Sequence, residues 1–221
     1  MMPRQLTRGF AVALFLLLWF TALLTPLFAQ NTITLLNHVF NAESTGNVLT
    51  LPIKLWIPAA ICNNATPASH GWSFPTSNPG VPACQTGSNT QYGTMDFADA
   101  SDLSAQFHLR LPSDWSSTVD ANFVWFTSAT SGNVVWQLST ICVADDETSD
   151  PAFNTASTVT DAAKGTTLEL NDAAITTVTV TGCAAGELAF LKVQRNSAHA
   201  SDSLAATARL VGLELTYRRA I

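Results

Sequence analysis

Period-two alternation of apolar and polar residues is the feature that most restricts how this chain can fold. In Phe107–Leu111 every second residue is apolar and the residues between are polar, which is the pattern of a strand with one buried face. Turn residues separate similar segments at 32–36, 48–57, 119–126, 134–143, 175–180, 187–194 and 206–217. About eight strands in one chain predict an all-β fold, an antiparallel two-sheet β-sandwich of jelly-roll type.

The first 29 residues have the organisation of a secretory signal. Arg4 and Arg8 precede an apolar run over 10–24, Pro26 follows it, and Ala29 offers a small residue for cleavage. The apolar run is shorter than the roughly twenty residues that span a bilayer, although an uncleaved anchor is the alternative. We therefore expect one β-sandwich domain over 30–221, without a stable membrane span, in a secreted, extracellular or periplasmic location.

Charge and composition exclude one large class of partners. The 221 residues carry a formal net charge of −6, and 12% of them are charged. Phosphate binding requires clustered Lys and Arg, and the cations here are scattered along the chain. We expect no nucleic-acid partner.

Four cysteines lie in the part of the chain that we expect to be exported, at Cys62, Cys84, Cys142 and Cys183. An even count outside the cytosol predicts two disulfides, and sequence alone allows three pairings. We favour Cys62 with Cys84, which share one turn-rich segment, and Cys142 with Cys183, which each lie next to a predicted strand. A zinc site is the alternative, but the chain has no CxxC pair.

Two irregular segments interrupt the strand pattern. Residues 58–95 are rich in Pro, Asn, Gly and Ser, so we expect a disulfide-tied loop insertion there, a kind of segment that often carries function. Ser131–Gly132–Asn133 has the composition of a tight turn, and we expect it to close a hairpin between the strands that contain Trp125 and Trp136.

From Met95 to the C-terminus the order of features resembles a β-sandwich domain of bacteriophage tail-fibre and other virion structural proteins, and of related metagenomic proteins. The residues that carry the resemblance are Asp96–Asp99, Leu111–Trp115, Phe123–Phe126, Ser131–Trp136, Ala185–Leu188, Arg195, Asp202–Ser203 and Leu210–Tyr217. The resemblance implies a particle-surface or receptor-contacting module. Physically, Trp125 and Trp136 would fill the sandwich and Arg195 would pair with Asp202.

Acidic residues supply the candidates for a structural calcium site, the one cofactor that the sequence suggests. The candidate ligands form one run, Asp145, Asp146, Glu147 and Asp150, and one trio, Asp96, Asp99 and Asp102. Neither spacing matches an EF-hand loop, and Asp is equally typical of solvated turns.

Tryptophans supply the candidates for glycan binding by ring stacking. Trp125 and Trp136 lie in strongly alternating segments and are expected in the core, whereas Trp72 lies in the irregular insertion and Trp115 follows a turn. The better ligand-binding candidates are therefore Trp72 and Trp115.

Catalytic motifs are absent from the sequence. It contains no nucleophile elbow, HExxH, P-loop or dinucleotide fingerprint, so we expect no enzyme. The leading hypothesis is an exported structural or self-assembling protein of a particle, filament or cell surface. The alternative is a carbohydrate-binding module with exposed Trp and a glycan partner, and a glycan hydrolase with an unrecognised carboxylate pair is the weakest of the three.

Overall fold

The structure is a computed structural model that describes residues 43–45, 48–68 and 71–220. Residues 53–220 form one compact unit, and residues 1–52 belong to a separate unit with Ile221. In the separate unit, β1 (Glu43–Thr45) pairs with Val48–Thr50, the first residues of β2 (Val48–Pro58). The expected signal over 1–29 and the predicted strand over 32–36 lie outside the described residues.

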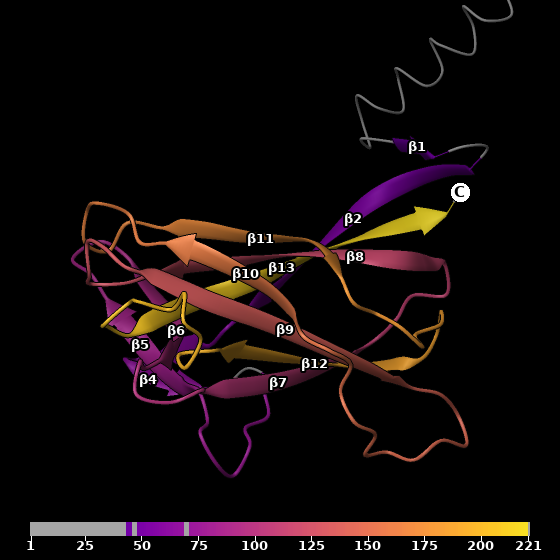
Figure 1. Ribbon diagram of the computed structural model, residues 1–221, viewed down its shortest axis with the longest axis horizontal. Coiled ribbons are helices and arrows are strands. Elements are labelled where there is room, and N and C mark those ends of the chain that lie inside the picture. The colour runs from indigo at the N-terminus through magenta and orange to yellow at the C-terminus, as the bar shows by residue number, and fades with distance from the viewer. Residues whose placement is uncertain (1–42, 46–47, 69–70, 221) are drawn as a thin grey trace, which may run out of the picture. The chain divides into compact units, whose positions relative to one another are not determined.

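The compact unit is an antiparallel two-sheet β-sandwich, as the alternation predicts (Figure 1). In the larger sheet, β13 (Ala208–Ala220) is central: β2 and β6 (Gln91–Phe97) neighbour it, and β8 (Trp115–Phe126) pairs along its length. β5 (Val81–Thr86) extends this sheet beyond β6, and β11 (Asn171–Val178) extends it beyond β8. The smaller sheet has the order β10 (Ser157–Ala162), β9 (Asn133–Val143), β12 (Leu188–Arg195), β7 (Ser104–Arg110).

The core lies between the inward faces of these two sheets. Trp136 of β9 stacks on Phe123 of β8 with ring centroids 5.4 Å apart, and it contacts Phe97 and Trp125 edge-on. Trp125 and Trp136 are fully buried, as the sequence predicts. Offset and edge-on aromatic contacts of this kind contribute about 0.5–1.5 kcal/mol each beyond the burial of apolar area.

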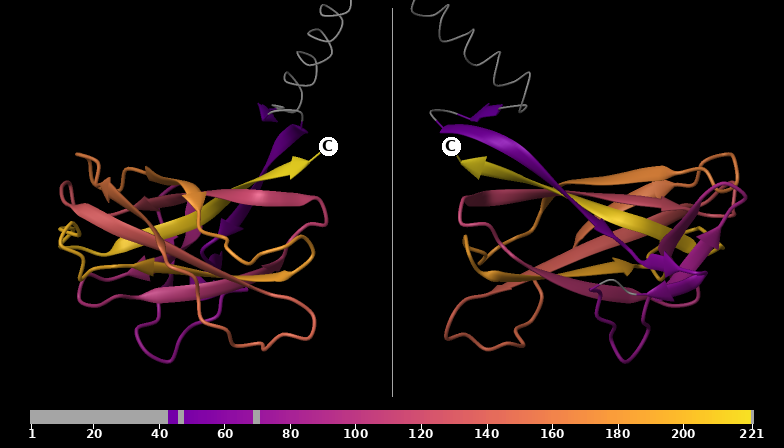
Figure 2. Two further views of the ribbon diagram at one scale, coloured as in Figure 1. Left: turned by 45° about the vertical axis from the view of Figure 1, so that its right-hand side comes forward. Right: turned by 180° about the vertical axis from the view of Figure 1, so that it is seen from behind.

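The two margins of the sandwich differ. At one margin, hydrogen bonds join the start of β10 and the residues before it to the residues just after β11: Thr179 N donates to Ser157 Oγ at 2.8 Å and Asn154 Nδ2 donates to Thr181 O at 2.8 Å. At the other margin, no ladder among the described strands joins β2 to β7. Figure 2 shows β2 (violet) beside β13 (yellow), with β7 in the opposite layer.

The segment 58–95 consists largely of strands, so the expectation of a loop insertion is wrong. It contains a small two-stranded sheet of β3 (Ile61–Asn63) and β4 (Thr66–Ala68), and its β5 and β6 belong to the larger sheet. Ser73 exchanges backbone hydrogen bonds with Gln106 of β7. The prolines in this segment indicated loops rather than strands. Pro is nevertheless tolerated in an edge strand, and β5, which holds Pro82, has a neighbour on one side.

The turn at Ser131–Asn133 is a crossover between the two sheets, so the expectation of a hairpin is wrong. β8 pairs with β11 and β13, whereas β9 pairs with β10 and β12. Gly132 has φ +101°, and a Cβ there would lie 2.9 Å from both Leu204 Cα and Ser203 O. Glycine is therefore required by the backbone conformation and by the close approach of the 203–204 segment.

We expect Gly132→Ala to lower the free energy of unfolding by about 2 kcal/mol, because it combines a strained φ with a backbone clash. Gly165→Ala is the matched control, since a Cβ at Gly165 meets nothing within 4 Å. Urea denaturation of both variants measures the difference. Equal stability of the two variants would contradict this account of Gly132.

Candidate functional site

The disulfide pairing favoured from the sequence is confirmed. Cys62 is bonded to Cys84, and Cys142 is bonded to Cys183. Two disulfides are typical of proteins that fold outside the reducing cytosol. Within the part of the chain that the structure describes, no helix is long and apolar enough to cross a membrane.

Arg195 and Asp202 form a buried ion pair, the pairing expected from the sequence. Arg195 donates to Asp202 through Nε at 3.1 Å and through Nη2 at 2.7 Å, and its side chain is fully buried. The guanidinium also donates to the carbonyl oxygens of Phe97, Leu204 and Ala206. These bonds hold the turn before β13 in place, so the pair has a structural role.

The acidic candidates for calcium do not converge. Among the described residues, no group of three or more His, Cys, Asp or Glu side chains is placed to hold a metal ion. Glu147 accepts a hydrogen bond from the Ala144 amide at 2.9 Å, and Asp102 accepts from the Ala198 amide at 3.1 Å. Both carboxylates therefore order local turns.

Trp72 and Trp115, the tryptophans proposed to stack on a glycan, are both buried. Trp72 is 5% exposed; its Nε1 donates to Pro58 O at 2.9 Å and its ring contacts Phe107 edge-on. Trp115 is 8% exposed. The expectation for these two residues is corrected because the 71–80 segment folds back on β7, and because Trp115 begins a strand whose inward face is in the core.

Among the described tryptophans, the exposed one is Trp56 on β2, at 47% exposure. Its six-membered ring packs on Gly212 of β13: a Cβ at Gly212 would lie 2.4 Å from Trp56 Cζ2 and 2.6 Å from Cη2. Because Gly212 has no side chain, part of the indole can pack directly on its backbone. The rest of the ring is open to solvent on the outward face of the larger sheet.

Polar side chains surround Trp56 on this outward face. Lys54, two residues before Trp56, forms an ion pair with Glu214 at 2.7 Å. Glu214 is opposite Asn122 of β8, and Asn122 Nδ2 donates to Asp172 Oδ1 of β11 at 2.8 Å. With a strand spacing of about 4.8 Å, the distance from β2 to β11 is roughly 14 Å. We call these residues, Trp56, Gly212, Lys54, Glu214, Asn122 and Asp172, the Trp56 face.

A second aromatic group lies farther along the same outward face. Tyr92 contacts Phe126 edge-on with ring centroids 6.0 Å apart, and the Arg209 guanidinium lies 5.8 Å from the Phe126 ring centre. Asp96 is 3.5 Å from Arg209 Nε. Burial raises the pKa of the Asp96 carboxyl, and the Thr94 hydroxyl and Arg209 oppose this rise. The outward face therefore combines exposed rings with hydrogen-bonding groups.

The position of Trp56 in its strand already indicates an exposed ring, although the sequence pattern favoured the tryptophans near irregular segments. In 48–57 the residues of one phase are all aliphatic, and the other phase holds Thr50, Pro52, Lys54 and Trp56. A large aromatic ring in the polar phase of an alternating strand indicates an exposed ring.

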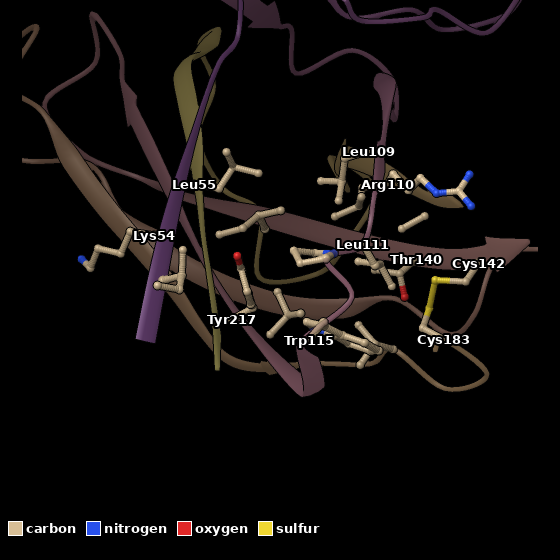
Figure 3. Close-up of a pocket in the computed structure, with 17 residues that line it drawn as sticks. Lys54, Leu55, Leu109, Arg110, Leu111, Trp115, Thr140, Cys142, Cys183 and Tyr217 are labelled. Carbon is tan, nitrogen blue, oxygen red and sulfur yellow. A yellow bond between two sulfur atoms is a disulfide. The ribbon is translucent and has the colours of Figure 1, made fainter. Parts of the chain in front are cut away.

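An apolar cavity of about 230 Å³ lies between the sheets at their β2–β7 margin (Figure 3). Leu109 of β7 and Leu111 just after that strand line one side, and Trp115 and Tyr217 line it from the larger sheet. The Cys142–Cys183 disulfide lies at one end, while the side chains of Lys54 and Arg110 extend away from the cavity.

Comparison with known proteins gives likenesses of fold. No family model and no curated protein sequence matches the chain. A family 35 carbohydrate-binding module from Cellvibrio japonicus is 10% identical with TM-score 0.42, covering 74% of this chain and 92% of that one. A family 35 module from an environmental isolate is 13% identical with TM-score 0.43, covering 73% and 91%.

A third similar structure is a family 11 carbohydrate-binding module from Clostridium thermocellum, in complex with a β-1,3-1,4-mixed-linked tetrasaccharide. It is 7% identical with TM-score 0.40, covering 71% of this chain and 94% of that one. Likenesses at this level concern the arrangement of strands, and they assign no ligand to this chain.

These findings overturn the resemblance to tail-fibre and virion domains, and with it the leading hypothesis of a structural or self-assembling protein. The similar solved structures include carbohydrate-binding modules and two enzymes, an isomalto-dextranase and an arabinofuranosidase, of which the match covers 34% and 27%. The residues that suggested the virion family include Trp125, Trp136, Arg195 and Asp202, which are buried in this structure. Core residues of this kind serve packing in sandwiches of many functions, so they do not identify one family.

Proposed function

We propose that this protein is an exported, non-catalytic carbohydrate-binding module, and that its glycan lies on the Trp56 face. The observation that carries the proposal is the Trp56 indole, 47% exposed and seated on the bare backbone of Gly212. A sugar ring presents an apolar C–H surface that packs on an aromatic ring, and its hydroxyls form hydrogen bonds with carboxylates and amides.

The groups around Trp56 suit a neutral glycan. Glu214 and Asp172 offer acceptors for sugar hydroxyls, Asn122 offers an amide, and Lys54 offers a donor. Lys54 is paired with Glu214, and Asp172 adds a further negative charge, so an acidic sugar would meet net negative charge. An open sheet face accommodates an extended chain, which favours internal units of a polysaccharide over a buried single sugar.

An exported location goes with this function, because polysaccharides are outside the cytosol and the two disulfides are stable there. We propose the extracellular side of the cell or the periplasm as the working compartment. The glycan is the proposed partner.

We expect Trp56→Ala to weaken glycan binding about thirtyfold or more, since truncating a central Trp of a binding surface costs about 2 kcal/mol or more. Gly212→Val should weaken binding as well, because its side chain would displace the indole. A panel of soluble neutral polysaccharides in affinity electrophoresis, followed by calorimetry on the best ligand, measures both effects.

Leu168→Ala is the matched control, because Leu168 is an exposed apolar residue, at 56%, outside the Trp56 face. It should bind like the unaltered protein. Glycan binding that survives Trp56→Ala unchanged would move the site elsewhere, and an absence of binding to any polysaccharide in the panel would refute the function.

A further inference from the structure

We infer that the cavity between the sheets binds a second, chemically different ligand: an alkyl chain of about six carbons that ends in a neutral hydrogen-bond acceptor such as an ester or ketone oxygen. The cavity lies between the inward faces of the sheets, whereas Trp56 is on the outward face of the larger sheet. The inference is therefore independent of the glycan proposal.

The lining of the cavity excludes a sugar and favours an alkyl chain. Aliphatic side chains from both sheets form the walls, among them Ile53, Leu111, Leu191 and Leu215. Burying several hydroxyls among such side chains without partners costs several kcal/mol. An alkyl chain has no hydroxyls to desolvate, and its transfer from water to an apolar cavity is favourable.

The size of the cavity is suited to a small ligand. A cavity of about 150 Å³ with aliphatic walls stays dry and binds benzene, and the volume here is about 230 Å³. The larger volume accommodates an alkyl chain of about six carbons together with a small polar end group. The access route is the β2–β7 margin, where Leu55 is 40% exposed and no ladder joins the two strands in the described part of the chain.

One polar group in the wall lacks a partner. Trp115 lines the cavity, and its buried Nε1–H has no hydrogen-bond partner among the described residues. Leaving a buried donor unpaired costs about 1–3 kcal/mol, and a ligand with an acceptor oxygen would remove that cost. The indole of Trp136 is likewise buried without a partner for its Nε1–H, but Trp115 is the tryptophan in the lining of the cavity.

The test is a titration of the protein with methyl hexanoate and with hexane, which has the chain without the acceptor. Indole N–H signals of ¹⁵N-labelled protein report the binding. We expect both compounds to bind saturably, the ester more tightly, and only the ester to shift the Trp115 indole proton to lower field.

Two variants separate the parts of the inference. Ala189→Leu fills the cavity, because Ala189 is a buried residue of its wall, and it should weaken both compounds at least tenfold. Trp115→Phe keeps an aromatic ring and removes the donor, so the ester should bind about fivefold more weakly and hexane less than twofold.

The inference fails if the unaltered protein shows no saturable binding of either compound. It also fails if Ala189→Leu, with native fold shown by its backbone amide spectrum, binds as tightly as the unaltered protein. Equal weakening of ester and hexane by Trp115→Phe would overturn the assignment of the acceptor to Trp115. Trp56→Ala should leave both titrations unchanged, which keeps this site distinct from the glycan face.

Discussion

Replacing Arg195 with Met is expected to lower the free energy of unfolding by about 3–5 kcal/mol, because it leaves the Asp202 carboxylate buried without its cation. The side chains of both residues are almost completely inaccessible, at 0% and 2%. The change also leaves three backbone carbonyl oxygens, those of Phe97, Leu204 and Ala206, without their donor. Urea denaturation followed by tryptophan fluorescence measures the loss.

Arg219→Ala is the control for the removal of a cation as such. Arg219 forms an ion pair with Asp114 while its side chain remains 50% exposed, and exposed pairs contribute about 0–1 kcal/mol. The double variant Arg195→Met/Asp202→Leu should be less destabilised than the sum of its two single variants, since it removes both charges together. A loss below about 1 kcal/mol for Arg195→Met would contradict the anchoring role of this pair.

Removing the Cys142–Cys183 disulfide is expected to lower the free energy of unfolding by about 4 kcal/mol, because its sequence separation of 41 residues closes a long loop. The chain-entropy relation gives about 3.4 kcal/mol for the Cys62–Cys84 disulfide, with a separation of 22. The difference in stability between the two disulfide variants should exceed this entropic value, since Cys142 also packs in the core.

The double variants Cys142→Ala/Cys183→Ala and Cys62→Ala/Cys84→Ala test this order of stability. The fully reduced protein, denatured in the presence of dithiothreitol, provides the comparison in which the sulfur atoms remain. If the Cys62–Cys84 variant were the less stable of the two, the entropy of the closed loop would not be the dominant contribution.

The strands that the sequence predicts are those with a continuous apolar phase. β8, β9, β12 and β13 have such a phase, and its apolar residues are buried along β9 and β12 and over 119–125 and 208–215 of β8 and β13. β10 was missed because its sequence, Ser157–Ala162, is rich in Thr and Ser and contains Val159 as its one large aliphatic residue. The ladder with β9 holds β10 in its sheet, and the Thr179 amide, next to β11, donates to the Ser157 hydroxyl of β10.

The candidate site was predictable in part. The phase of Trp56 within its strand indicates an exposed ring, but its seating on Gly212 joins residues about 150 positions apart, which no local pattern encodes. The same holds for the cavity, whose walls come from strands throughout the chain. The hairpin expected at Gly132 failed for a related reason, because a turn composition does not reveal in which sheet the next strand pairs.

The contrast between the two margins of the sandwich has a consequence for its internal motions. The β10–β11 margin is held by hydrogen bonds between side chains and backbone at the ends of these strands, whereas strands β2 and β7 share no ladder in the described region. Transient separation of the layers should therefore begin at β2 and β7. Amide protons at residues 53–57 and 107–110 would then exchange with solvent sooner than those of β9 and β8.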